Sequence, residues 1–172
     1  MKRDVKRKYL PEFVYGGMDG AITTFVIISG VVGASLSSAI VLILGFANLF
    51  ADGFSMAVSN YFSVKSRNEM LKEPEKNPMK TATATFLSFF VIGLIPLFSF
   101  VAAAITKNSG LIENQFRYSV VLTALALITV GWFRGVITGK HKIRSVIQTL
   151  VIGGIAALLA FSVGYFIRSL IG

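Results

Sequence analysis

With 172 residues, 54% of them hydrophobic, and a mean hydropathy of +0.72, the chain is too apolar for a soluble domain of its size. Its net charge of +9 comes from Lys and Arg residues in short segments between apolar runs, which indicates membrane topology rather than a nucleic-acid partner. The absence of cysteine and the single histidine exclude disulfides, thiolate metal sites and histidine clusters. No enzyme motif occurs, so we expect neither an enzymatic activity nor a permanently bound cofactor.

Five apolar runs are each long enough to cross the bilayer as a helix, which takes about 20 residues. The sequence therefore predicts an all-α polytopic protein with one transmembrane domain over residues 1–172. The predicted spans cover approximately residues 12–34, 39–64, 81–106, 118–139 and 145–171. Residues 65–80 form a short hydrophilic loop, which contains Pro74 and Pro78 and is too small for a separate domain.

The basic residues predict the orientation of these spans. The N-terminal arm, the loop at 65–80 and the turn region at 134–144 hold 5, 5 and 4 Lys or Arg residues. The other side of the predicted membrane holds only Lys107, Arg117 and Arg168. Because short cytosolic segments are enriched in Lys and Arg, we expect a cytosolic N-terminus and a C-terminus on the opposite side.

The first two spans carry acidic residues at bilayer depth, where a charge is costly and therefore indicates a function. At about 100° per residue, the polar residues of each span fall on one helical face. The candidates on these faces are Glu12, Asp19 and Thr23 in the first span and Asn48, Asp52, Ser55 and Met56 in the second, with Asn60 at the edge of the stripe.

The depth of each candidate residue in the membrane suggests which of them could bind the same ion. Counted from Lys8 and Lys65, Asp19 lies about 16 Å and Met56 about 13 Å from the same side of the membrane, and Asp52 lies one turn deeper. A carboxylate with a thioether suits a first-row divalent cation such as Fe²⁺ or Mn²⁺ better than Mg²⁺ or Ca²⁺. Metal and proton compete for carboxylate oxygens, so the same acid offers H⁺ as a coupling ion.

Each candidate also has an alternative interpretation without a transport role. Asp19 and Asp52 could be buried acids that hydrogen-bond to hydroxyls or amides, and Met56 could fill the core. Asn48 and Asn60 are typical of hydrogen bonds between membrane helices. Glu12 lies at the predicted cytosolic entrance, where an interfacial residue needs no special role.

The order and spacing of several segments resemble the vacuolar iron transporter family. These segments are Asp19-Gly20-Ala21-Ile22-Thr23-Thr24, residues 30–35, Phe54-Ser55-Met56-Ala57, Thr138-Gly139 and residues 152–157. The resemblance implies a homodimer of five-helix protomers that moves Fe²⁺ or Mn²⁺ out of the cytosol in exchange for protons. It also implies a pathway lined by the first two helices of both protomers, with Asp19 as the translocating acid, Met56 as the sulfur ligand and Glu12 at the cytosolic mouth.

The chain departs from the family pattern in two respects. Plant members have a Glu-rich metal-collecting cytosolic domain between the second and third spans, where this chain has only residues 65–80. Some members have Glu where this chain has Asn48 or Asn60, and we expect Asp52 to compensate. The alternatives are a transporter of another cation and a non-transporting membrane scaffold. The compact length favours a prokaryotic plasma membrane. If the source is a eukaryote, we expect an endomembrane such as that of the vacuole.

Overall fold

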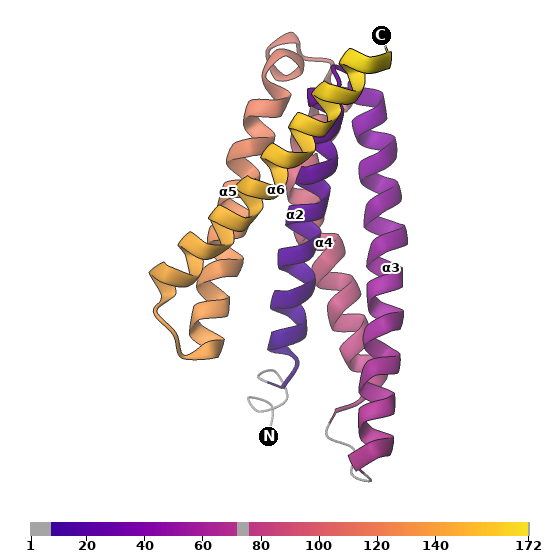
Figure 1. Cartoon of the computed structure of the whole chain (residues 1–172), viewed down its shortest axis with the longest axis vertical. Coiled ribbons are helices and arrows are strands. Elements are labelled where there is room, and N and C mark those ends of the chain that lie inside the picture. The colour runs from indigo at the N-terminus through magenta and orange to yellow at the C-terminus, as the bar shows by residue number, and fades with distance from the viewer. Residues whose placement is uncertain (1–7, 72–75, 172) are drawn as a thin grey trace.

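The computed structural model describes residues 8–71 and 76–171, which form an all-helical bundle (Figure 1). Its helices are α2 (Leu10–Gly33), α3 (Ser38–Leu71), α4 (Pro78–Thr106), α5 (Ser109–Thr138) and α6 (Lys142–Ile171). All five are long and apolar enough to cross a membrane. The predicted all-α architecture, with five helices that could each span a membrane, is thereby confirmed within the described residues.

Two helices extend well beyond the apolar runs that predicted them. α3 continues to Leu71, beyond the predicted end of the span at residue 64, and α5 begins at Ser109 rather than at residue 118. Most of the described part of the predicted loop is therefore helical. Hydropathy locates the part of a helix that suits lipid, whereas a helix continues into a polar environment until a cap or a breaker ends it. Asn108 acts as such a cap, because its side chain accepts a hydrogen bond from the Leu111 amide at 3.2 Å.

α2 is the central helix of the bundle and packs against each of the other four described helices. Glycines allow its backbone to approach α4 closely. A Cβ at Gly93 of α4 would lie 2.9 Å from the carbonyl oxygen of Gly20, and a Cβ at Gly20 would overlap the Phe89 carbonyl. Membrane helices associate through such close packing of small residues, because lipid provides no hydrophobic force between them.

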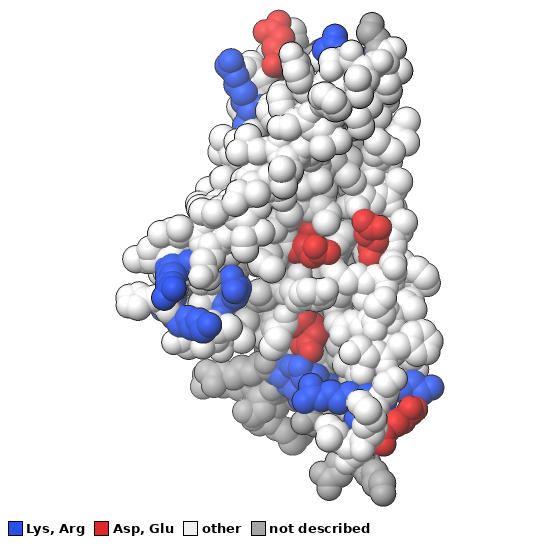
Figure 2. Space-filling model, in the orientation of Figure 1, with Lys and Arg blue, Asp and Glu red and all other residues white. Residues whose placement is uncertain are grey.

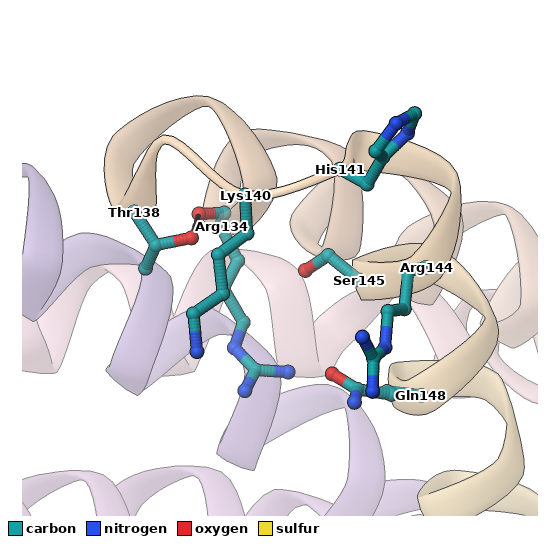
Figure 3. A pocket seen from close by; sticks show the side chains of 7 residues that line it. All are labelled: Arg134, Thr138, Lys140, His141, Arg144, Ser145 and Gln148. Carbon is teal, nitrogen blue, oxygen red and sulfur yellow. Dashed lines mark hydrogen bonds between the residues drawn. The ribbon is translucent and has the colours of Figure 1, made fainter.

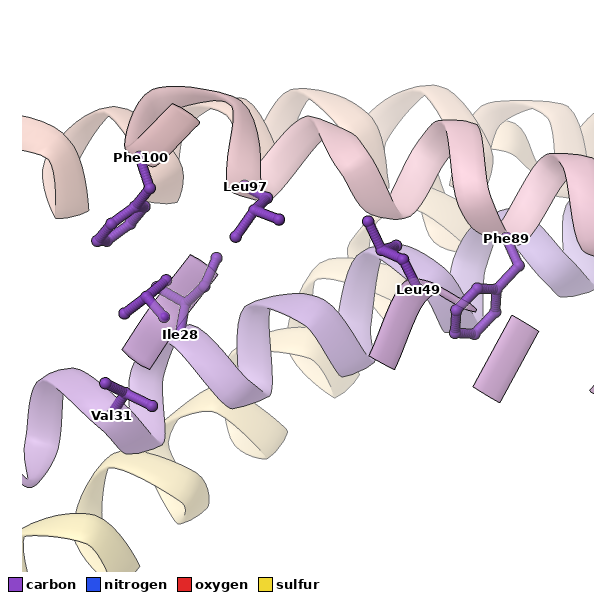
Figure 4. Packing of buried hydrophobic residues seen from close by; sticks show 7 residues of the cluster. Ile28, Val31, Leu49, Phe89, Leu97 and Phe100 are labelled. Atoms are coloured by element: carbon purple, nitrogen blue, oxygen red, sulfur yellow. The ribbon is translucent and has the colours of Figure 1, made fainter. Parts of the chain in front are cut away.

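An apolar cluster joins α2, α3 and α4 on the side of the bundle away from α6 (Figure 4). Leu49 of α3 and Phe89 and Leu97 of α4 are fully buried there. The complete cluster consists of Ile28, Val31, Val41, Leu49, Phe89, Leu97 and Phe100. Its interlocking side chains fix the register of α3 against α2 and α4, and thereby the positions of the acidic residues on the first two helices.

α3 packs mainly against α2 and α4, and at its first residue the Ser38 hydroxyl oxygen accepts a hydrogen bond from the Gln115 side-chain amide of α5. Its outer face is exposed and carries a polar stripe as well as large apolar residues. Asp52 and Ser55 lie on this face beside Phe50 and Phe54, which are 58% and 65% exposed. The arrangement leaves a carboxylate uncovered on a helix that is apolar enough to span a membrane.

Candidate functional site

A hydrogen-bonded link holds α3 against α2. The Thr23 hydroxyl donates to the Asp19 carbonyl oxygen at 2.9 Å, and the Asn48 side-chain amide donates to the Thr23 hydroxyl oxygen at 3.3 Å. Asn48 is buried, with 8% of its surface exposed. Thr23 and Asn48 each lie one helical turn from an acidic residue, Asp19 on α2 and Asp52 on α3.

The two acids lie at the same level of the hairpin. Asp19 precedes the last residue of α2 by 14 positions, and Asp52 follows the first residue of α3 by the same number. Asp19 is partly buried between the helices, whereas Asp52 is exposed. Figure 2 shows neighbouring acidic side chains on this face of the molecule, midway along its long axis.

The sequence suggested that Met56 lies at the depth of Asp19 and that Asp52 lies one turn deeper, and the structure differs from this expectation. The distances counted from Lys8 and Lys65 assumed that both lysines mark one membrane surface, but α3 continues as a helix for six residues beyond Lys65. Figure 1 shows this end of α3 projecting past the first turn of α2. Asp52, rather than Met56, is consequently the residue of α3 that lies level with Asp19.

The other α3 candidates lie around this pair. Met56 lies one turn from Asp52, towards the C-terminal end of α3. Its side chain is partly buried and packs against the apolar cluster. Ser55 is exposed on the outer face of α3, the face that also carries Asp52. Asn60 is tied to α4, because its side-chain amide donates to the Thr85 hydroxyl oxygen at 2.7 Å.

Within the described residues, one copy of the chain offers few side chains that could bind a metal ion. No group of three or more His, Asp or Glu side chains within the described residues could hold a metal ion. Asp19 and Asp52 supply carboxylate oxygens, and Met56 supplies a thioether one turn away. Such a mixed set suits a first-row transition metal better than Mg²⁺ or Ca²⁺. Water or a second copy of the chain would have to complete its coordination.

Glu12 occupies a small cavity at the beginning of α2. The Lys76 ammonium forms an ion pair with its Oε1 at 2.6 Å, while its Oε2 is buried without a hydrogen-bond partner. The side chains of Glu12 and Lys76 are 12% and 27% exposed. The cavity has a volume of about 150 Å³ and is lined by Glu12, Asn60, Ser63, Val64, Arg67, Asn68 and Lys76.

Sequence reasoning did not find Lys76 as a partner of Glu12. The two residues are 64 positions apart, and no periodic pattern relates them. The sequence indicated only that both residues lie on the predicted cytosolic side of the membrane. Two glutamates of the same connection, Glu73 and Glu75, lie outside the described residues.

Comparison with known proteins gives a consistent assignment. The sequence model of the VIT family matches residues 10–77 and 70–165, two segments that overlap between α3 and α4. The vacuolar iron transporter of Plasmodium berghei is 24% identical over 95% of this chain and 84% of its own length. Vacuolar iron transporter homolog 4 of Arabidopsis thaliana is 29% identical over 91% of this chain and 82% of its own length. The vacuolar iron transporter of Toxoplasma gondii is 24% identical over 95% of this chain and 76% of its own length.

The lengths of these alignments are also informative. The alignment with the Plasmodium protein extends over 228 positions, more than the 172 residues of this chain, whereas the alignment with the Arabidopsis homolog extends over 171. The Plasmodium relative therefore contains residues that have no counterpart here. The resemblance noted from the sequence is confirmed over most of the chain. The chain belongs to the VIT family, a family of membrane transporters rather than enzymes.

Proposed function

We propose that the chain moves Fe²⁺, and also Mn²⁺, out of the cytosol, with Asp19 and Asp52 as the acids of the pathway and Met56 as its softer ligand. The observation that carries the proposal is the level pair of Asp19 and Asp52 on two adjacent helices that are long and apolar enough to cross a membrane. A charge at such a depth is rarely retained without a role in transport. The names of the relatives, vacuolar iron transporters, support iron as the transported substrate.

Proton exchange is the coupling that this chemistry favours. A metal ion and protons compete for the same carboxylate oxygens, so a metal that arrives at the pair releases any proton held there. The two carboxylates repel each other when both are charged, and the repulsion is strongest in a low-dielectric environment. A divalent cation or a proton relieves it. The pair can thus carry either ion in turn, as an antiporter requires.

A homodimer accounts for the uncovered outer face of α3. Asp52 and Ser55 are exposed there, on a helix that packs mainly against α2 and α4. Polar side chains directed at lipid are unfavourable, so a protein surface is expected to cover them. A second copy would bring its own hairpin to this face. The pathway would then lie between the α2–α3 hairpins of both protomers, and the partner would complete the metal coordination.

The direction of transport follows from the charge distribution. The basic segments favour a cytosolic N-terminus, which places the Glu12 cavity at the cytosolic end of the pathway. Glu12 is then a carboxylate at the entrance that a cation meets before it reaches Asp19 and Asp52. The membrane is a prokaryotic plasma membrane or, in a eukaryotic cell, that of the vacuole, the compartment named for the relatives. The metal is cargo and not a resident cofactor.

Metal uptake into proteoliposomes tests the proposal. With a pH gradient imposed, we expect Fe²⁺ and Mn²⁺ flux well above that of empty liposomes, and loss of this flux in Asp19→Asn. Glu113→Gln, which removes an exposed acid in the first turns of α5, is the matched control and should retain the flux. Flux of a different cation alone would favour the alternative substrate. No flux of any cation in either gradient direction would favour a membrane scaffold and refute the transport function.

A further inference from the structure

A hollow lined by basic and polar residues lies at the turn between α5 and α6, apart from the acidic pair. Its volume is about 490 Å³, and it is lined by Arg134, Thr138, Lys140, His141, Arg144, Ser145 and Gln148. None of these residues is acidic, and no described residue forms an ion pair with Arg134, Lys140 or Arg144. Three permanent positive charges therefore share one concave site without a counterion from the described part of the chain.

The basic and polar side chains border the hollow from two sides. Figure 3 shows Arg134 and Lys140 reaching into the hollow from one side and Arg144 and Gln148 from the other, whereas His141 is turned away. Arg guanidinium groups bind phosphate with paired hydrogen bonds, and the Gln148 amide offers a further donor. Mutually repelling cations converge at low cost only when an anion lies between them.

A buried hydroxyl provides an independent indication. Ser145 is only 5% exposed, and its Oγ has no hydrogen-bond partner. Figure 3 shows this hydroxyl directed between the cationic side chains. A buried polar group without a partner costs free energy, so its persistence in a lined pocket indicates a missing ligand. The positive-inside rule explains why basic residues occur at this end of the helices, but not why a hydroxyl is buried among them unpaired.

The position of the hollow identifies the source of the anion. It lies at the ends of α5 and α6, two helices that are apolar enough to cross a membrane, where lipid headgroups would surround the protein. Trp132 of α5 is 47% exposed beside the same turn, and the Lys142 ammonium lies 5.0 Å from its ring centroid. Tryptophan is enriched at the membrane–water interface. Basic pockets between helices at this depth bind phosphate-bearing headgroups.

From this arrangement we infer that the α5–α6 hollow binds a phosphate group, with Arg134, Lys140 and Arg144 as its counterions and Ser145 and Gln148 as hydrogen-bonding partners. An anionic lipid headgroup supplies this phosphate. The site is separate from the Asp19–Asp52 pair, and its test does not depend on metal transport.

Trp132 is the only tryptophan of the chain and therefore reports on lipid near this turn. The full chain is reconstituted in phosphatidylcholine nanodiscs that contain a small fraction of brominated lipid, either phosphatidylglycerol or phosphatidylcholine. We expect brominated phosphatidylglycerol to quench Trp132 more strongly at the same mole fraction. Each positive charge removed from the hollow should lower this preference by about fivefold.

Matched variants separate the pocket from general surface charge. Arg134→Gln combined with Arg144→Gln should abolish most of the preference, whereas Arg117→Gln combined with Arg168→Gln, two basic residues outside the hollow, should preserve it. Lys140→Gln lies in the exposed turn and provides a second variant whose folding is not in question. The unfolding temperature of every variant in phosphatidylcholine alone should match that of the unmodified chain.

A competition arm distinguishes the two sources of phosphate. If inorganic phosphate added to the nanodiscs removes the preference, the hollow binds phosphate but takes it from solution as readily as from lipid. If the preference persists, the lipid headgroup is the ligand. Equal quenching by both brominated lipids in the unmodified chain, with no change in Trp132 fluorescence on addition of inorganic phosphate, would overturn the inference.

Discussion

If Glu12 receives the entering metal ion, as we propose, the Lys76 ammonium competes with that ion for the same carboxylate. It occupies Oε1 at 2.6 Å, and the other carboxylate oxygen is buried and unpaired in a cavity of about 150 Å³. The substitution Lys76→Gln removes the competing charge and retains a side chain that can hydrogen-bond to Glu12. We expect metal ions to reach the Glu12 cavity at lower concentration in this variant.

The magnitude follows from the exposure of the pair. With 27% of the Lys76 side chain and 12% of the Glu12 side chain exposed, the ion pair is only partly screened by solvent. A pair of this kind contributes about 1 kcal/mol, which corresponds to about a fivefold change in an equilibrium constant. The KM for Mn²⁺ should therefore fall by up to about fivefold, while kcat stays unchanged because the Asp19–Asp52 pair is intact.

Initial rates of Mn²⁺ uptake into proteoliposomes, measured over a range of Mn²⁺ concentrations, test this expectation. Lys80→Gln is the matched control, since it removes the same charge from an exposed position in the first turn of α4. Glu12→Gln should raise KM, and the double variant with Lys76→Gln should behave like Glu12→Gln alone. An unchanged KM in Lys76→Gln, or an equal fall in Lys80→Gln, would refute the competition.

Other predictions concern the packing and assembly that position the acids. Gly20→Ala should destabilise the bundle by about 1–3 kcal/mol or prevent folding, because its Cβ would overlap the Phe89 carbonyl, whereas Gly154→Ala, with open space at its Cβ, should not change the thermal unfolding temperature. Asn48→Leu should lower stability by about 1 kcal/mol in detergent unfolding, since it removes the donor that links α3 to Thr23. Ser55→Cys, introduced into a chain without cysteine, should form disulfide-linked dimers on mild oxidation, and Ser162→Cys on the exposed face of α6 should not. Dimers from Ser162→Cys alone would contradict the proposed interface.

The bundle could be predicted because its signal is local. Each apolar run must satisfy its backbone hydrogen bonds within itself in lipid, so five such runs already specify five helices. The helix ends could not be predicted equally well. Residues 65–69 are polar, and hydropathy gives no reason to extend α3 through them, although charged residues are compatible with a helix outside the membrane.

The site was only partly predictable because its partners come from different helices. Helical periodicity places Asp19 and Thr23 on one face, but it does not reveal which residue of α3 lies level with them. That relation depends on the length of the turn between Gly33 and Ser38 and on the apolar cluster that fixes the register. The contact of Asn60 with Thr85 also crosses between helices, and the sequence contains no local pattern for it.

The flux of Asp52→Asn is the most direct measurement of the central claim that Asp19 and Asp52 act as a pair. If the level carboxylates form the translocation site, Fe²⁺ flux in this variant should fall to that of empty liposomes, as in Asp19→Asn. The folded fraction, checked by size-exclusion chromatography, should match that of Glu113→Gln. Retention of full Fe²⁺ flux in Asp52→Asn, together with its loss in Asp19→Asn and Met56→Ala, would contradict the account and return the site to Asp19 and Met56.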